Sequence, residues 1–185
     1  MNAFKKTIKA AVLTLLVALP GMAASTISFA QTGEIKNLAG YVDLGDLTAS
    51  YGEPKVEINL GPSMLGLAGA IVGADDPDTQ AALSGLKSVR LRVYDIEASA
   101  DAALEQIQKT SKQLLSKDWE QIVKVKDEGE EVRVFLKMVS NKIEGMTVLV
   151  AGDEDQAVFI NIIGTINPED LNKLTAAFDV DVDLP

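Results

Sequence analysis

The chemistry open to this chain is limited by two residue types that it lacks. Its 185 residues contain no cysteine and no histidine. Without histidine there is no Ser-His-Asp triad, and the most common general base and zinc ligand are missing. Without cysteine there is no thiol nucleophile, no disulfide and no lipid-modified cysteine. What remains is carboxylate chemistry, a Ser-Lys pair, or a Ca²⁺ or Mg²⁺ site with oxygen ligands.

Acidic clusters are the candidates for such chemistry, and there are three of them: Asp75, Asp76 and Asp78; Asp153, Glu154 and Asp155; Asp179, Asp181 and Asp183. None follows the twelve-residue calcium loop with its central glycine and final glutamate. The first cluster is better explained as a helix start, since Asp76 suits the N-cap and Pro77 the first helical position. The second is better explained as a hairpin turn. We therefore predict no metal ligand.

Catalysis by a pair of carboxylates depends on distances that a sequence does not give. With 27 acidic residues, chance pairs are certain, so their presence is no evidence for a hydrolase. We predict no catalytic residue, no cofactor and a protein that is not an enzyme. A histidine-free carboxylate hydrolase is the less favoured alternative.

The net charge restricts the partners of the chain. It is −10, and becomes more negative if the lysine-containing N-terminal segment is removed. Nucleic acids and anionic membrane surfaces attract basic proteins, because lysine and arginine neutralise their phosphates. We therefore expect neither as a partner.

The first thirty residues have the pattern of a secretory signal peptide. Three lysines precede a short apolar run, residues 10–19, which a Pro-Gly pair ends. Ser28 and Ala30 are small residues at the −3 and −1 positions, which predicts cleavage after Ala30. The apolar run is shorter than the roughly 20 residues that a membrane-spanning helix needs. The sequence thus predicts a soluble periplasmic or secreted bacterial protein that does not span the membrane after cleavage.

The rest of the chain predicts one α+β domain, residues 55–178, between an N-terminal extension (31–54) of uncertain structure and a tail (179–185). Within the extension, "GYVDLGDL" fits a short edge strand or a loop. Alternating apolar residues predict strands, and helical spacing or capping residues predict helices. The strands are 55–60, 88–96, 119–126, 131–139, 146–152 and 156–166; the helices are 63–73, a second from 76 onward, 99–115 and 167–178.

The short connections in the second half of the domain determine its topology. Connections of this length permit antiparallel hairpins, so the last four strands form a meander. We expect an antiparallel or mixed sheet with the helices packed on one face. Gly164, near the end of the last strand, marks a bulge or a close backbone approach. Asn167 and Pro168 then begin the final helix.

A possible interaction surface comes from the most apolar segment of the mature chain, "SMLGLAGAIVG" at 63–73. It is either a buried helix or an exposed patch, and exposed apolar patches mark protein or lipid contacts. Trp119 is the single tryptophan, with packing as its simpler role and partner contact as the alternative. The residues of the candidate surface are Met64, Leu65, Leu67, Ile71 and Trp119.

Several of these segments together resemble the DUF4252 family of exported bacterial proteins. The matching stretches, between Val56 and Phe178, are "GLKSVRLRVYDIE", "DWEQIVKVKDEGEEVRVFLKM", "IEGMTVLVAGDED" and "VFINIIGTINPEDLNKL". The resemblance implies a small envelope protein without an assigned activity, so there are no family catalytic residues to carry over. Many members are lipoproteins, and this chain departs from them because it has no cysteine to carry the lipid.

The functional hypothesis is therefore a non-catalytic binding or interaction module of the cell envelope, with an envelope protein or an apolar ligand as its partner. The alternative is a periplasmic carrier or chaperone for lipids or other apolar ligands. That alternative predicts an apolar cavity between the sheet and the helices.

Overall fold

The computed structural model describes residues 34–43, 51–72, 77–96, 100–127, 130–153 and 156–168. The predicted signal peptide with its cleavage site and the predicted C-terminal helix beyond Pro168 lie outside these residues. So do most members of the three acidic clusters.

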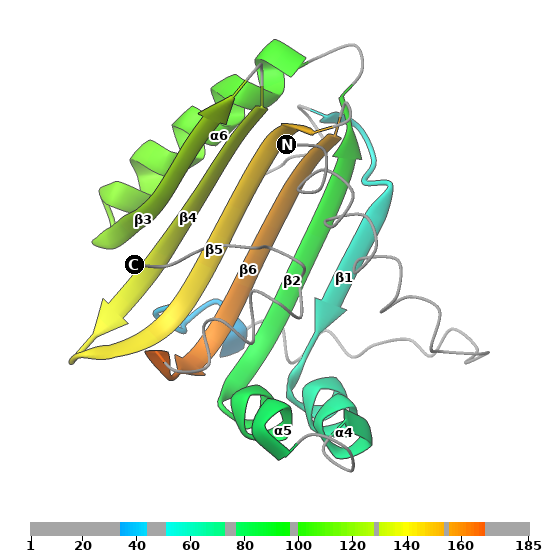
Figure 1. Ribbon diagram of the computed structural model, residues 1–185, viewed down its shortest axis with the longest axis vertical. Coiled ribbons are helices and arrows are strands. Elements are labelled where there is room, and N and C mark those ends of the chain that lie inside the picture. The colour runs from blue at the N-terminus through cyan, green and yellow to red at the C-terminus, as the bar shows by residue number, and fades with distance from the viewer. Residues whose placement is uncertain are drawn as a thin grey trace.

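Strands form a single antiparallel sheet in the described part of the chain (Figure 1). Their order across the sheet is β1-β2-β6-β5-β4-β3, so the last four strands are neighbours in chain order and β2 pairs with β6. The α+β class expected from the sequence is confirmed. The strands are β1 (Val56–Leu60), β2 (Leu86–Asp95), β3 (Trp119–Asp127), β4 (Glu130–Val139), β5 (Lys142–Asp153) and β6 (Gln156–Ile166).

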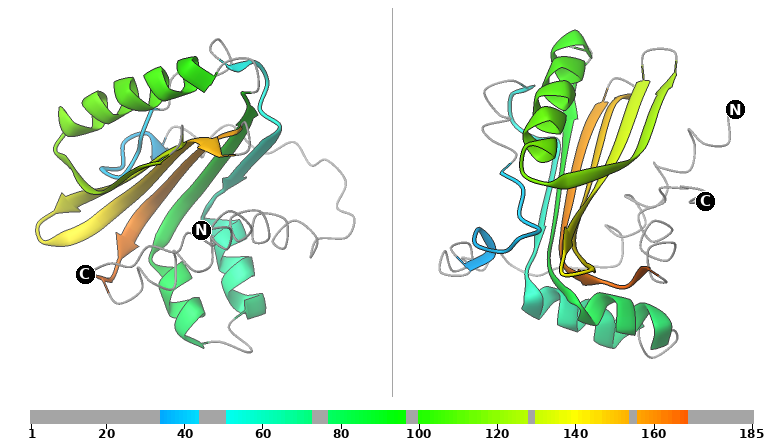
Figure 2. Two further views of the ribbon diagram at one scale, coloured as in Figure 1. Left: turned by 45° about the horizontal axis from the view of Figure 1, so that its top comes forward. Right: turned by 90° about the vertical axis from the view of Figure 1, so that its left-hand side faces the viewer.

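Helices α4 (Pro62–Val72), α5 (Pro77–Ser84) and α6 (Ala100–Leu115) accompany the sheet. Helices α4 and α5 connect β1 to β2 and lie at one end of the sheet (Figure 1). Helix α6 connects β2 to β3 and crosses one face of the sheet (Figure 2). Among the described residues, no helix combines the length and the apolar character needed to cross a bilayer.

The sheet separates two hydrophobic cores because successive side chains of a strand point to opposite faces. In β4, Val134 belongs to one core and Phe135 to the other. Helix α6 supplies Ala103, Ile107 and Leu114 to the second, which we call the helix-side core. The opposite, far-side core includes Leu65 of α4, so the described helices do not all pack on one face.

Gly164 lies where two backbones touch, as its position in the sequence predicted. Its φ is 135°, and a Cβ there would come 2.5 Å from the carbonyl oxygen of Gly85. The register between β2 and β6 shifts beside it, between Leu86 and Ser88. The glycine is therefore a structural requirement of the β2–β6 pairing.

Candidate functional site

Residues 34–43, which we call the N-terminal arm, lie on the same side of the sheet as α6 (Figure 2). The side chain of Val42 is buried in the helix-side core together with Ile107 and Leu114 of the helix. The sequence left this region open between an edge strand and a loop. It is an extended segment at 41–43 that joins no strand of the sheet.

Asn161 of β6 binds the backbone of the arm from the middle of the sheet. Its side chain is fully buried. The Oδ1 atom accepts a hydrogen bond from the Val42 N–H at 3.2 Å, and Nδ2 donates to the Gly40 carbonyl at 2.9 Å. Nδ2 also lies 3.1 Å from Oγ1 of Thr147. One side-chain amide therefore pairs with the N–H and C=O of two nearby residues, much as a neighbouring strand would.

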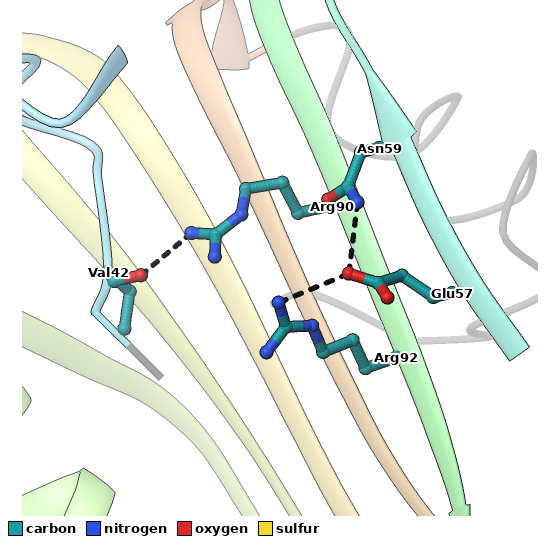
Figure 3. A network of polar contacts seen from close by, with 5 residues as sticks. All are labelled: Val42, Glu57, Asn59, Arg90 and Arg92. Carbon is teal, nitrogen blue, oxygen red and sulfur yellow. Dashed lines mark hydrogen bonds and ion pairs between the residues drawn. The ribbon is translucent and has the colours of Figure 1, made fainter. Parts of the chain in front are cut away.

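Arg90 of β2 binds the arm beside Asn161, since the two residues face each other across the β2–β6 pairing. Its Nη1 donates to the Val42 carbonyl at 2.9 Å (Figure 3). Its guanidinium carbon lies 4.9 Å from the centre of the Tyr41 ring, within the range of a cation–π interaction. Both backbone groups of Val42 are thus bound by side chains of the sheet.

A second polar cluster lies toward the β1 edge of the same face. Arg92 pairs with Glu57 at 3.2 Å, and Asn59 donates to the same carboxylate at 3.0 Å (Figure 3). The Glu57 side chain is 42% exposed. Such solvent-exposed pairs contribute little to stability.

Two glycines bring the arm into direct contact with β5. A Cβ on Gly40 would overlap the carbonyl oxygen of Glu144. A Cβ on Gly145 would lie 2.5 Å from the Gly40 Cα and 3.0 Å from Cη2 of Trp119. The φ angle of Gly40 is not positive, so the need for glycine there comes from this contact alone. We call Arg90, Trp119, Gly145 and Asn161 the arm site.

A small pocket lies between the arm, α6 and β3. Tyr41, Thr110, Gln113, Lys117 and Trp119 are among its lining residues. Thr110 is buried, and among the described residues its hydroxyl has no hydrogen-bond partner. The lining of this small pocket mixes polar side chains with apolar ones, among them Val42 and Leu114.

An aromatic cluster packs near the start of α6. The rings of Tyr51 and Tyr94 are 5.2 Å apart, and the ring of Phe159 lies 5.8 Å from that of Tyr51. Burial raises the pKa of both tyrosine hydroxyls above the ordinary tyrosine value.

Glu131 is the buried acid of the described residues, with 2% of its surface exposed. Its carboxylate accepts a hydrogen bond from Nε of Arg133 at 2.5 Å and forms an ion pair with the same guanidinium. The two residues are close in β4, on one face of the strand. Among the described residues, no group of three or more acidic side chains is arranged to hold a metal ion.

The five residues of the candidate interaction surface fall into different environments. Leu65 and Trp119 are 3% and 4% exposed and belong to the far-side and helix-side cores, so they are not available at the surface. Met64 and Leu67 are 43% and 49% exposed on α4. Ile71 is in the last turn of α4, and its side chain lies outside the described part of the structure.

Comparison with protein families assigns most of the chain to one known family. Residues 51–174 match the family model of a domain of unknown function, DUF4252. The chain belongs to this family. No curated protein matched it. The DUF4252 match begins at Tyr51, so Arg90, Gly145 and Asn161 lie inside the matched region and the arm lies outside it.

The arm site was not found from the sequence. Asn161 is a polar residue in the otherwise apolar run "VFINII", and a buried amide needs hydrogen-bond partners. Used as a signal, this residue would have indicated that another group binds β6 at this position. It would not have identified the group, because the arm precedes Asn161 by more than a hundred residues.

Proposed function

We propose that this protein is exported and acts in the cell envelope as a non-catalytic module that binds another protein through the exposed side of α4. We call Met64 and Leu67 the α4 patch. Export is supported by the lysine-rich start, the short apolar run and the small residues before Gln31. A non-catalytic role is supported by the absence of histidine and cysteine from the sequence.

The exposure of α4 is the observation that carries the binding role. The helix, PSMLGLAGAIV, has no charged residue. Most soluble helices turn polar residues to the solvent, but α4 exposes Met64 and Leu67 by almost half of their surface. Burying such side chains against a partner contributes about 1.5–3 kcal/mol each when the burial is complete. The α4 patch is thus suited to an apolar contact.

A protein partner is favoured over a lipid surface because of charge. The net charge of the chain is −10, which opposes approach to anionic lipids. An apolar patch on an acidic protein is better matched by a partner protein with an apolar contact area and a basic or neutral rim.

Cross-linking in intact cells tests this proposal, with a photo-reactive residue in place of Ala70 on the same helix. In the otherwise unchanged chain, we expect one recurrent protein adduct by mass spectrometry. The double variant Met64→Asp/Leu67→Asp should lose that adduct while keeping its far-UV circular dichroism and melting temperature. Leu115→Asp is the matched control, since Leu115 is 52% exposed on α6 and should leave the adduct unchanged.

Retention of the adduct in the double variant would contradict the proposal. Adducts with lipid in place of protein would favour the carrier alternative. Unfolding of the double variant would show that the α4 patch belongs to the core.

A further inference from the structure

We infer that the arm site is a peptide-binding site whose occupant in this chain, the N-terminal arm, can be supplied instead by a second copy of the chain. The ligand is a segment with glycine, an aromatic residue and an aliphatic residue in succession. The arm provides these as Gly40, at the end of a turn, and Tyr41 and Val42, which follow it in an extended stretch. This inference concerns a different surface from the α4 patch and does not depend on it.

The contacts of the arm are those of a bound peptide. The sheet side chains bind its backbone at the Gly40 carbonyl, the Val42 N–H and the Val42 carbonyl. Backbone recognition of an extended segment is a common mode of peptide binding, with pockets for alternate side chains adding specificity. Here the Val42 side chain enters the helix-side core and the Tyr41 ring stacks against Arg90.

The start of the family match separates the site from its occupant in the sequence. Asn161, Arg90 and Gly145 all lie within the matched family domain, and the arm precedes it. The arm also joins no strand of the sheet, so removing it breaks no strand pairing. The receptor residues therefore belong to the matched domain, and the arm is connected to it through the residues that precede Tyr51.

Because the arm is covalently connected to the domain, the chain's own arm occupies the arm site in preference to a free peptide. A segment on a short linker has an effective concentration in the millimolar range, which a free peptide must overcome. Exchange between two copies replaces each contact with an identical one, and such swapping is a low-cost route to dimers. A chain whose own arm cannot bind should accordingly accept an arm in trans.

The two contacting glycines allow the ligand and the receptor to be disabled separately. Gly40→Ala places a methyl group against the Glu144 carbonyl, which expels the arm and leaves the receptor intact. Gly145→Ala places a methyl group against Gly40 and Trp119, which blocks the receptor and leaves the arm intact. Gly66→Ala is the matched control, because a Cβ at Gly66 would meet no atom within 4 Å.

The first test titrates the full-length chain with a fluorescent synthetic peptide of residues 34–43 and follows anisotropy. We expect saturable binding to the Gly40→Ala chain and at least about tenfold weaker binding to the unchanged and Gly66→Ala chains, whose own arms compete. The same peptide with alanine at the position of Gly40 should bind the Gly40→Ala chain roughly ten- to a hundredfold more weakly, from the overpacking that its methyl group introduces.

The second test mixes the two variants. Neither the Gly40→Ala chain nor the Gly145→Ala chain has both a functional arm and a functional receptor, so each should be monomeric by analytical ultracentrifugation. Their equimolar mixture should contain a heterodimer. Adding Met64→Asp/Leu67→Asp to either chain should leave the heterodimer intact, so failure of the α4 proposal and failure of this one are distinguishable.

Absence of peptide binding to a folded Gly40→Ala chain would overturn the inference. Loss of the fold in that chain would also overturn it, because the arm would then be an essential part of the core and not a replaceable ligand. If the Gly145→Ala chain fails to fold, the peptide titration still tests the inference, because it does not use that variant.

Discussion

At the scale of single residues, Asn161 is the side chain that binds the N-terminal arm to β6. It lies in the centre of an apolar strand, where an amide without partners would be costly, and its partners come from the arm and from Thr147. The polar residue in β6 and the extended conformation at 41–43 therefore have a single explanation. The side-chain amide of Asn161 and the backbone of the arm satisfy each other's hydrogen-bonding groups.

Replacing Asn161 with alanine should release the arm. The change leaves the Val42 N–H and the Gly40 carbonyl without this partner, at a cost of about 1–3 kcal/mol for each group that stays buried. We expect faster hydrogen exchange of the Val42 amide, measured by mass spectrometry on a peptide that covers 40–43, and a lower free energy of unfolding.

Asn59→Ala is the control for this prediction. Asn59 is exposed, and its described hydrogen bond joins it to the Glu57 side chain, so exchange of the Val42 amide should not change. Equal exchange in the Asn161→Ala and unchanged chains would show that Asn161 does not hold the arm.

At the scale of elements, local pattern predicted most of the fold. The alternation of Val132, Val134 and Leu136 against Arg133 and Lys137 placed the faces of β4 correctly. Short connections placed β3 to β6 side by side, because so few residues allow nothing except a hairpin. These features are encoded within a few residues of one another, which is why a single sequence reveals them.

The features that were not predicted depend on residues far apart in the chain. The pairing of β2 with β6 is one, and the binding of the arm to Asn161 is another. The candidate surface could not be predicted for a related reason. Hydrophobicity alone does not distinguish Leu65, which is buried, from Leu67, which is exposed. That difference arises from how α4 rests on the sheet.

Helix α6 gives an element-scale prediction, because its amphipathic spacing places one side in the helix-side core. Ile107 is fully buried and Leu115 is 52% exposed on the same helix. Ile107→Ala should lower the free energy of unfolding by about 2–5 kcal/mol through the lost contacts and the cavity. Leu115→Ala should change it by no more than about 0.5 kcal/mol.

Urea unfolding followed by circular dichroism measures both changes, provided that the m-value is unaltered. Similar effects of the two substitutions would contradict the packing of α6 described above.

At the scale of the whole molecule, the two faces of the sheet are covered differently. The helix-side core is closed by α6 and the arm. On the far side, α4 supplies Leu65 and makes its sheet contacts with β1 and β2. Val134, Val148 and Ile162, in β4 to β6, are nevertheless buried on that side. Leu83 of α5 also packs against this core.

The helix that the sequence predicts in the C-terminal segment is our candidate for a further cover on the far side. Residues 167–178 have the pattern of a helix with Leu171, Leu174 and Phe178 on one side, and this segment follows directly on β6. Beyond Pro168 it lies outside the described residues, so its place on the far side stays a prediction. A two-layer domain needs such an element, because an apolar sheet face must be buried against another layer.

Truncation of the full-length chain after Pro168 tests this prediction. Each of the three apolar side chains that is removed should cost about 1.5–3 kcal/mol of stability if it is fully buried, and the exposed sheet should bind a hydrophobic dye. Truncation after Phe178 is the control, since it removes only the acidic tail and should leave both the melting temperature and dye binding nearly unchanged. If the shorter chain melts like the control and binds no dye, the far side is covered by another segment, and the C-terminal helix has a different role.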